Sequence, residues 1–129
     1  MQAHSGHFSF IQCAGTREEP ANYCSRVCCA KALAAAVAIL EKNPRARVRI
    51  FYRDIMTYGE SEKLYTEARR LGALFIAFDA DVKPEVTVDG GTVTVKGFDP
   101  VMQEAVELAP DLLVLSTGLA PSDTGMLRD

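Results

Sequence analysis

The first half of the chain alternates short apolar runs with longer segments of helical periodicity. Residues 8–13, 48–52 and 73–78 are short and apolar, a pattern typical of buried strands. Residues 22–42 and 61–71 repeat apolar positions at the spacing of one helix face. The order strand, helix, strand, helix, strand predicts a parallel sheet whose connections are right-handed crossovers.

Polar and small residues mark the ends of both predicted helices. Asn22 is the predicted N-cap of the first helix, because its side chain can accept a hydrogen bond from a first-turn amide. Lys42 suits the negative end of that helix, and the pair Asn43-Pro44 stops it. Gly72 ends the second helix.

The second half of the chain changes to a two-residue alternation of apolar and polar positions. Residues 85–89 and 92–96 alternate in this way, and Gly90-Gly91 between them predicts a tight hairpin. Residues 101–108 have a composition that favours a helix, with a third strand of the meander as the alternative. Residues 111–116 predict a final buried strand.

This order of elements predicts a Rossmann-like α/β domain: a βαβαβ parallel sheet, a small antiparallel β-meander and a closing parallel strand. It resembles the NAD-type domain of the pyridine nucleotide-disulfide oxidoreductases. The segment DLLVLSTGLAP at 111–121 resembles the strand and turn that end that domain. We therefore expect residues 1–129 to form a single Rossmann-like domain.

Composition and charge narrow the classes of function. With 129 residues, 48% hydrophobic and 24% charged, the chain can build a globular core without metals or disulfides. A net charge of −3 and the lack of a basic run argue against nucleic acid as a partner. The longest apolar run, at 32–40, is too short for a membrane span, which needs about 20 residues. The lack of a secretory signal predicts a reducing, cytoplasmic compartment.

The first strand-to-helix turn lacks the sequence that binds a dinucleotide. In a Rossmann domain that turn carries G-x-G-x-x-G, whose glycines let the backbone approach a pyrophosphate. Here Gly15 is the only glycine between the predicted strand and helix. The sequence therefore argues against ordinary NAD binding and leaves a degenerate NAD(P) domain as a weaker hypothesis.

Four cysteines occupy this turn and the start of the helix: Cys13, Cys24, Cys28 and Cys29. Cys24 and Cys28 are four residues apart and share a face of the predicted helix, and Cys29 lies about 100° further round it. The helix N-terminus carries a partial positive charge, which suits a cluster with four thiolates. We expect the four sulfurs to converge at the head of this helix.

Spacing alone leaves four interpretations of these sulfurs open. A [4Fe–4S] cluster takes cysteine ligands. Structural zinc also accepts four cysteines, usually through paired C-x2–4-C knuckles that this spacing lacks. A redox disulfide is a third interpretation, although no C-x-x-C motif is present. Four unliganded thiols are the fourth, because cysteine is often buried for packing alone.

The cysteine string carries a resemblance to a known family. FIQCAGTREE at 10–19, followed by NYCSRVCC at 22–29, resembles the signature F-I-Q-C-x-G-S-R…Y-C-S-R-x-C-C of the family formed by the A-subunits of heterodisulfide reductase. The segments IFYRDIMTYG at 50–59 and LVLSTGLAP at 113–121 also resemble that family. The resemblance spans nearly the whole chain, and it favours the iron–sulfur interpretation.

The resemblance implies a cofactor, its ligands and a set of partners. It makes Cys13, Cys24, Cys28 and Cys29 the ligands of a [4Fe–4S] cluster beside a flavin. It implies an electron-transfer domain excised from a longer flavoprotein, with FAD bound by the rest of that chain and with other subunits of a heterodisulfide reductase-like complex as partners. Such a fragment can lose its cluster and has no turnover of its own, so no catalytic residue is expected. The alternative function is a zinc-stabilised or thiol-only scaffold that docks other subunits.

A few residues near the cysteines depart from the family pattern or permit two interpretations. Ala34 stands where members often have a lysine near the flavin, and Lys31 is the nearest lysine. Arg17 and Arg26 either interact with the cluster or form surface ion pairs. Asp54, after the second strand, is interpreted as a loop carboxylate.

Overall fold

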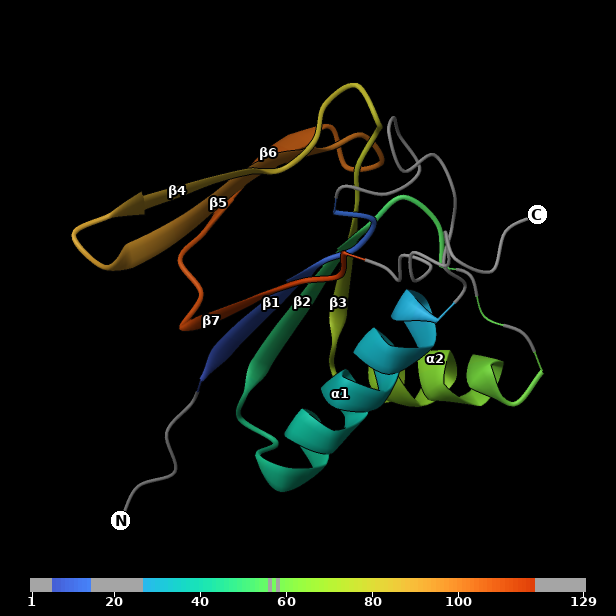
Figure 1. Ribbon diagram of the computed structural model, residues 1–129. Coiled ribbons are helices and arrows are strands. Elements are labelled where there is room, and N and C mark those ends of the chain that lie inside the picture. Colours follow the sequence, from blue (N-terminus) through green and yellow to red (C-terminus); the bar gives the residue numbers. More distant parts are fainter. Residues whose placement is uncertain (1–5, 15–26, 56, 58, 118–129) are drawn as a thin grey trace, which may run out of the picture.

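The structure, a computed structural model, describes residues 6–14, 27–55, 57 and 59–117 of the chain. A parallel sheet lies between a layer of two helices and a three-stranded antiparallel meander (Figure 1). The elements are β1 (His7–Ile11), α1 (Cys28–Lys42), β2 (Arg47–Tyr52), α2 (Ser61–Arg70), β3 (Leu74–Ala77), β4 (Glu85–Asp89), β5 (Thr92–Asp99), β6 (Glu104–Leu108) and β7 (Leu112–Leu115). Neither helix of this described part is long and apolar enough to cross a membrane.

The parallel sheet has the strand order β3-β2-β1-β7 and confirms the Rossmann-like prediction. Phe10 in β1 pairs with Ile50 of β2 on one side and with Val114 of β7 on the other. The chain therefore moves outward from β1 through β2 to β3, and then returns to the opposite side of β1. This reversal beside β1 is the place where open α/β sheets bind ligands, outside the carboxyl ends of the strands.

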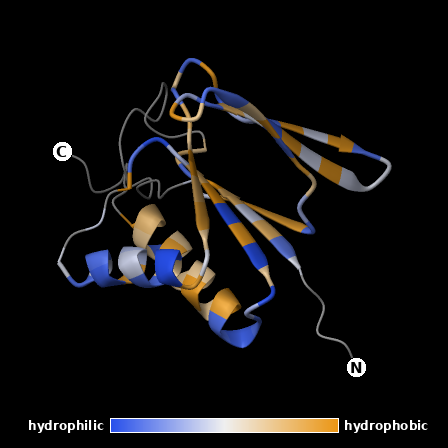
Figure 2. Ribbon diagram, turned by 180° about the vertical axis from the view of Figure 1, so that it is seen from behind, coloured by the Kyte–Doolittle hydropathy of each residue, from blue (hydrophilic) through white to orange (hydrophobic). Residues whose placement is uncertain are grey.

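Alternating side chains of the parallel strands form two cores. Phe10 and Ile50 point toward the helices, where they pack with Leu33 and Leu40 of α1. The next residue of each strand points toward the meander. Figure 2 shows apolar residues on the inner side of α1 and along the central strands. Both crossovers step in the same direction along the sheet, from β1 to β2 and from β2 to β3, so the usual right-handed connection puts both helices on the same face.

The second core lies between the parallel sheet and the meander. Ile11 and Phe51 from the sheet, Phe78 after β3 and Val95 of β5 are all buried in it. Phe51 is only 1% exposed. Gly97 of β5 leaves room for its ring, since a Cβ built on that glycine would lie 3.2 Å from Phe51 Cε1.

Helix α1 begins at Cys28, later than the expected start near Asn22. Val27 is its N-cap residue, and no side chain caps the first turn. The first helical hydrogen bond runs from the Lys31 amide to the Val27 carbonyl, at 3.0 Å. Asn22 lies outside the described residues, and the expected N-cap is wrong because the N-cap position belongs to Val27.

Residues 104–108 form strand β6, which confirms the alternative of a third meander strand and shows that the helix favoured by their composition is wrong there. Asp99 ends β5, and its carboxylate Oδ1 accepts hydrogen bonds from the Val101 amide at 2.9 Å and the Met102 amide at 3.2 Å. This turn redirects the chain to pair with β5. Val106 and Leu108 then pack against the second core at the two-residue period of a strand.

The hairpin between β4 and β5 confirms the Gly90-Gly91 prediction and provides a first test of the fold. Both glycines have positive φ, +56° and +84°, as a type I′ turn requires. We expect Gly91→Ala to lower the free energy of unfolding by about 1 kcal/mol, because the left-handed conformation is strained for an L-side chain. Gly90→Asn is the matched control and should be nearly neutral, since asparagine tolerates this conformation. Urea denaturation measures both, and equal stability of Gly91→Ala and the parent chain would contradict the turn geometry.

Candidate cysteine site

The predicted site residues lie at the carboxyl edge of the parallel sheet. β1 and β7 end side by side there, with Ile11 paired to Leu115, and α1 begins at the same edge (Figure 1). Ser116 continues from β7, and its amide donates to the Ile11 carbonyl at 2.9 Å. The switch in strand order therefore coincides with the start of the helix that carries Cys28 and Cys29.

Backbone hydrogen bonds hold the turn that carries Cys13. The Gln12 amide donates to the Phe51 carbonyl at 2.9 Å, and the Ala14 amide donates to the Ser116 carbonyl at 3.0 Å. The turn is therefore fastened to the ends of both neighbouring strands, β2 and β7. This attachment gives Cys13 a defined place at the edge.

Cys13 has a backbone conformation that favours glycine. Its φ is +58°, in the left-handed region, which costs about 1–2 kcal/mol for a residue with a Cβ. The Rossmann fold places a glycine of its phosphate-binding turn at this end of β1. A cysteine thus adopts a conformation that costs less free energy for glycine. Backbone strain of this kind is concentrated at functional sites.

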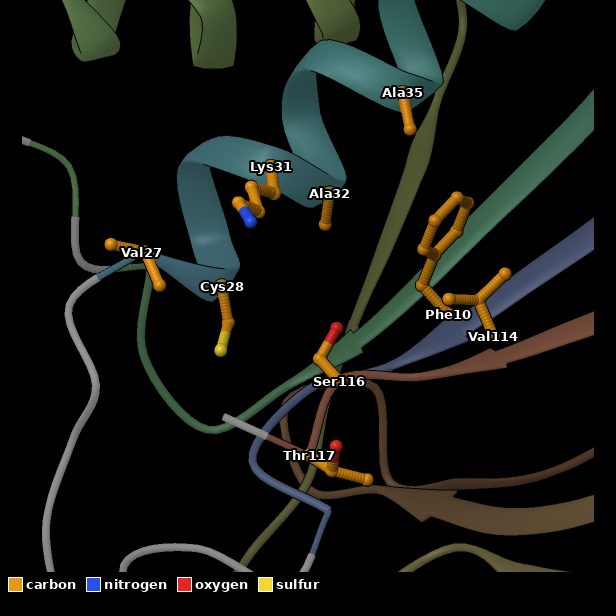
Figure 3. Close-up of a pocket in the computed structure, with 9 residues that line it drawn as sticks. All are labelled: Phe10, Val27, Cys28, Lys31, Ala32, Ala35, Val114, Ser116 and Thr117. Atoms are coloured by element: carbon orange, nitrogen blue, oxygen red, sulfur yellow. The ribbon is translucent and has the colours of Figure 1, made fainter. Parts of the chain in front are cut away.

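A cavity of about 270 Å³ lies on the helix side of the sheet, between α1 and the ends of β1 and β7; we call it the helix-face cavity. Figure 3 shows the Cys28 side chain extending from the first turn of α1 toward Ser116. Lys31, one turn further along α1, lines the same cavity and brings a positive charge to it. Its lining is Phe10, Val27, Cys28, Lys31, Ala32, Ala35, Val114, Ser116 and Thr117.

A second cavity, of about 140 Å³, lies on the meander side of the same edge; we call it the meander-face cavity. Cys13 and Gln12 line it together with Arg53 and Lys83. The remaining lining is Ile11, Ala14, Phe78, Pro84, Val86 and Leu115. The turn that follows β1 therefore separates two cavities, one beside Cys28 and one beside Cys13.

The Cys29 thiol contacts the loop after β2. Cys29 is 6% exposed, and its thiol donates to the backbone carbonyl of Asp54 at 3.6 Å. Asp54 thus contacts the cysteine site through its main chain. At the end of β2, burial raises the pKa of Tyr52, with smaller contributions from Tyr65 and Asp99.

The structure brings three of the four predicted cysteines to one edge without assembling a finished metal site. Cys13, Cys28 and Cys29 are not joined in disulfides. Among the residues that the structure describes, no three His, Cys, Asp or Glu side chains are grouped to hold a metal ion. Cys24, Arg17 and Arg26 are outside the described residues.

The polar residues around Cys13 are site residues that the sequence patterns did not reveal. Gln12 belongs to the cysteine string, yet it is also 1% exposed and lines the meander-face cavity. Arg53 and Lys83 line that cavity as well. The sequence does carry one signal for Gln12, which is a glutamine at the end of an apolar strand. A buried amide needs hydrogen-bond partners, so such a residue stands out.

Comparison with known proteins decides the family. No protein-family model matches the chain. It is 40% identical over 124 residues to the A-subunit of the H(2)/formate:CoB-CoM heterodisulfide,ferredoxin reductase of Methanococcus maripaludis, covering 92% of this chain. It is 35% identical over 120 residues to an iron–sulfur A-subunit of the CoB–CoM heterodisulfide reductase of Methanopyrus kandleri, covering 90%. The chain belongs to the heterodisulfide reductase A-subunit family.

The match covers one segment of those heterodisulfide reductase subunits. The chain spans 18% of the length of each of these two relatives. Among solved structures, thioredoxin reductase of T. acidophilum superimposes with a TM-score of 0.56 at 18% identity, over 91% of this chain and 32% of that one. The ornithine hydroxylase PvdA of Pseudomonas aeruginosa gives 0.55 at 11% identity, over 92% and 37%. At these identities the likeness concerns the fold alone.

Proposed function

We propose that this chain is the electron-transfer domain of an oxidoreductase that resembles the A-subunits of heterodisulfide reductase. In this proposal Cys13, Cys24, Cys28 and Cys29 hold a [4Fe–4S] cluster next to a flavin. The observation that carries it is the position of Cys13, Cys28 and Cys29, at the strand-order switch where this fold otherwise binds phosphates. The name of the Methanopyrus kandleri relative, which calls it an iron–sulfur protein, supports it.

The chemistry of the donor set fits such a cluster. Thiolates are the ligands of iron–sulfur clusters, and three cysteines described by the structure share one edge of the sheet. The N-terminus of α1, with Cys28 and Cys29 in its first turn, favours an anionic group. Lys31 adds a positive charge on the same helix. The segment with Cys24 completes the ligand set in this proposal.

The residues of this chain would hold the cluster and control its surroundings. A bound cluster supplies single-electron transfer, which needs no acid or base from the protein. Cys13 would be presented by the fastened turn after β1, and Cys28 by the first turn of α1 beside the helix-face cavity.

FAD and the remaining partners belong to a longer protein in this proposal. The chain corresponds to 18% of relatives that are named as reductase subunits. We assign FAD to the rest of such a flavoprotein chain, and we assign docking to other subunits of the complex.

The proposal is tested by the metal content of the chain. After anaerobic reconstitution with iron and sulfide, we expect about four of each per chain, with the visible absorption of a cluster that bleaches on reduction. Cys28→Ser should lower both contents and leave the far-UV circular dichroism of the apo-protein unchanged.

The opposite outcome would favour the alternative function. Retention of tightly bound zinc in place of iron, together with loss of folding in Cys28→Ser, would identify a zinc-stabilised scaffold, because binding energy of structural zinc is folding energy. No bound metal of either kind would leave a thiol-only scaffold.

A further inference from the structure

Two arginines of β2 lie on the face of the parallel sheet that carries the meander. Val48 and Ile50 of β2 pack in the core beneath the helices. Side chains of a strand alternate between faces, so Arg47 and Arg49 point to the opposite side. Phe51, the next residue on that side, is buried in the second core. The amino ends of β1 and β2 extend away from the meander (Figure 1), and the two arginines lie toward those ends.

A large apolar side chain lies beside Arg49 on this face. Arg49 is paired with Leu74 of the edge strand β3 on one side and with Ser9 of β1 on the other. Ile76 of β3 packs in the second core, so Leu74, two residues earlier, points to the same side of the sheet. Leu74 is 56% exposed, whereas Ser9 is buried. We call the surface formed by Arg47, Arg49 and Leu74 the arginine face.

The two guanidinium groups of the arginine face have no carboxylate partner in the part of the chain that the structure describes. The ion pairs formed within that part lie at helix α2, on the other side of the sheet. Partial burial and the nearby charge of Arg47 both lower the pKa of Arg49. Arginine nevertheless stays charged at ordinary pH, so its burial without a partner costs free energy. The fold thus holds two neighbouring positive charges that call for an anionic partner.

We propose that the arginine face docks a partner protein through an acidic segment, whose carboxylates pair with Arg47 and Arg49 and whose apolar side chain covers Leu74. Side chains two residues apart on a strand are separated by about 7 Å. An extended segment with a carboxylate at every second residue matches that spacing, and arginine binds carboxylates through two parallel hydrogen bonds. This inference goes beyond the proposed function, because the arginine face contains no cysteine and needs no cluster.

The make-up of the arginine face favours a partner protein over the two other occupants that it could attract. Arginine beside uncovered apolar surface is typical of protein–protein interfaces. Nucleic acid binds to extended basic surfaces, whereas this chain has a net charge of −3 and only two arginines on this face. A symmetric dimer through this face would bring like charges of two copies together, which is unfavourable.

Binding of a defined acidic probe tests the proposal. The probe is a fluorescein-labelled peptide of alternating glutamate and leucine, and the same peptide with glutamine in place of glutamate is the control probe. We expect fluorescence anisotropy to show binding of the glutamate peptide only, weakening as salt rises. Arg49→Gln should weaken this binding about tenfold, because its ion pair is partly desolvated. Arg47→Gln should have a smaller effect, because Arg47 is exposed and its ion pair is better screened.

The stability of the Arg49→Gln variant distinguishes docking from a structural role. In urea denaturation we expect it to be as stable as the parent chain or more stable, because a partly buried charge without a carboxylate partner among the described residues has been removed. A less stable variant with unchanged peptide binding would show that Arg49 is structural, which overturns the proposal. Arg49→Lys is the second variant if Arg49→Gln does not fold. It keeps the charge and loses the two-pronged geometry, so its affinity should be intermediate.

Lys96→Gln is the matched control for the loss of charge. Lys96 is exposed on β5, and its neighbour Val95 is buried, so Lys96 points to the outer face of the meander. This variant removes the same unit of charge away from the arginine face and should leave binding of the glutamate peptide unchanged. Equal weakening in Lys96→Gln and Arg49→Gln would show that the peptide responds to net charge alone, which overturns the proposal.

The remaining outcomes assign the arginine face to another occupant or to none. A parent chain that does not bind the glutamate peptide overturns the proposal. So does tighter binding of a DNA duplex, or self-association in sedimentation that Arg49→Gln abolishes. None of these measurements depends on iron. A chain that takes up no iron but binds the peptide at the arginine face therefore overturns the proposed cluster and supports the docking surface.

Discussion

If the proposed cluster is bound, Cys13→Gly is expected to abolish its binding while leaving the metal-free domain about as stable as before. The thiolate is lost, so iron and sulfide should fall to background after reconstitution. The stability change should stay within about 1 kcal/mol, for two opposing reasons. Glycine relieves the strain at φ +58°, worth about 1–2 kcal/mol. It also makes the unfolded chain more flexible, which costs about 0.5–1 kcal/mol.

Metal analysis and urea denaturation of the apo-protein measure the two effects of Cys13→Gly. Ala14→Gly is the control, because it adds a glycine to the same turn without removing a sulfur. It should keep the cluster. Full iron content in Cys13→Gly would show that Cys13 is not a ligand. If Cys13→Gly lowers the free energy of unfolding of the apo-protein by several kcal/mol, the Cys13 side chain contributes to stability by packing.

Phe51→Ala is expected to destabilise the domain by about 3–5 kcal/mol, the usual cost of removing a buried phenylalanine. Phe51 is 1% exposed in the core that joins the parallel sheet to the meander. Its ring lies beside Gly97 of β5, which has no side chain to fill the space left behind. The cavity therefore remains open, and the meander loses a buried contact with the sheet.

Chemical denaturation with urea measures this loss, and Phe98→Ala is the control. Phe98 lies on the same meander but is 37% exposed, so its removal should cost under about 1 kcal/mol. Similar effects of the two substitutions would contradict the assignment of the second core. A small loss in Phe51→Ala would mean that the meander packs elsewhere.

Local patterns predicted most of the elements because each depends on residues close in the chain. The strands β1, β2, β3 and β7 are short apolar runs. Such runs are typical of strands in a parallel sheet that is covered on both faces. Gly72, with φ +105°, ends α2 where its sequence predicted. The Gly90-Gly91 hairpin depends on two positive φ angles that glycine adopts at little cost.

The open choice at residues 101–108 and the expected helix start at Asn22 concern segments whose structure depends on distant partners. Residues 104–108 have a composition that suits a helix, but β5 offers an edge to pair with, and the Asp99 turn directs the chain onto it. A capping preference worth about 1 kcal/mol favours a start of α1 at Asn22. The N-cap of α1 is nevertheless Val27.

The sequence by itself determined the kind of domain and the family signature, and it predicted the four cysteines as the candidate ligands. Only the tertiary structure decided how the site is built around them. It holds Cys13 in a left-handed turn between β2 and β7, and it separates a cavity beside Cys28 from one beside Cys13. It also buries Gln12 with an amide nitrogen that has no partner among the described residues. These features arise where strands far apart in the sequence end side by side, and periodicity along one chain does not encode which strand ends will meet.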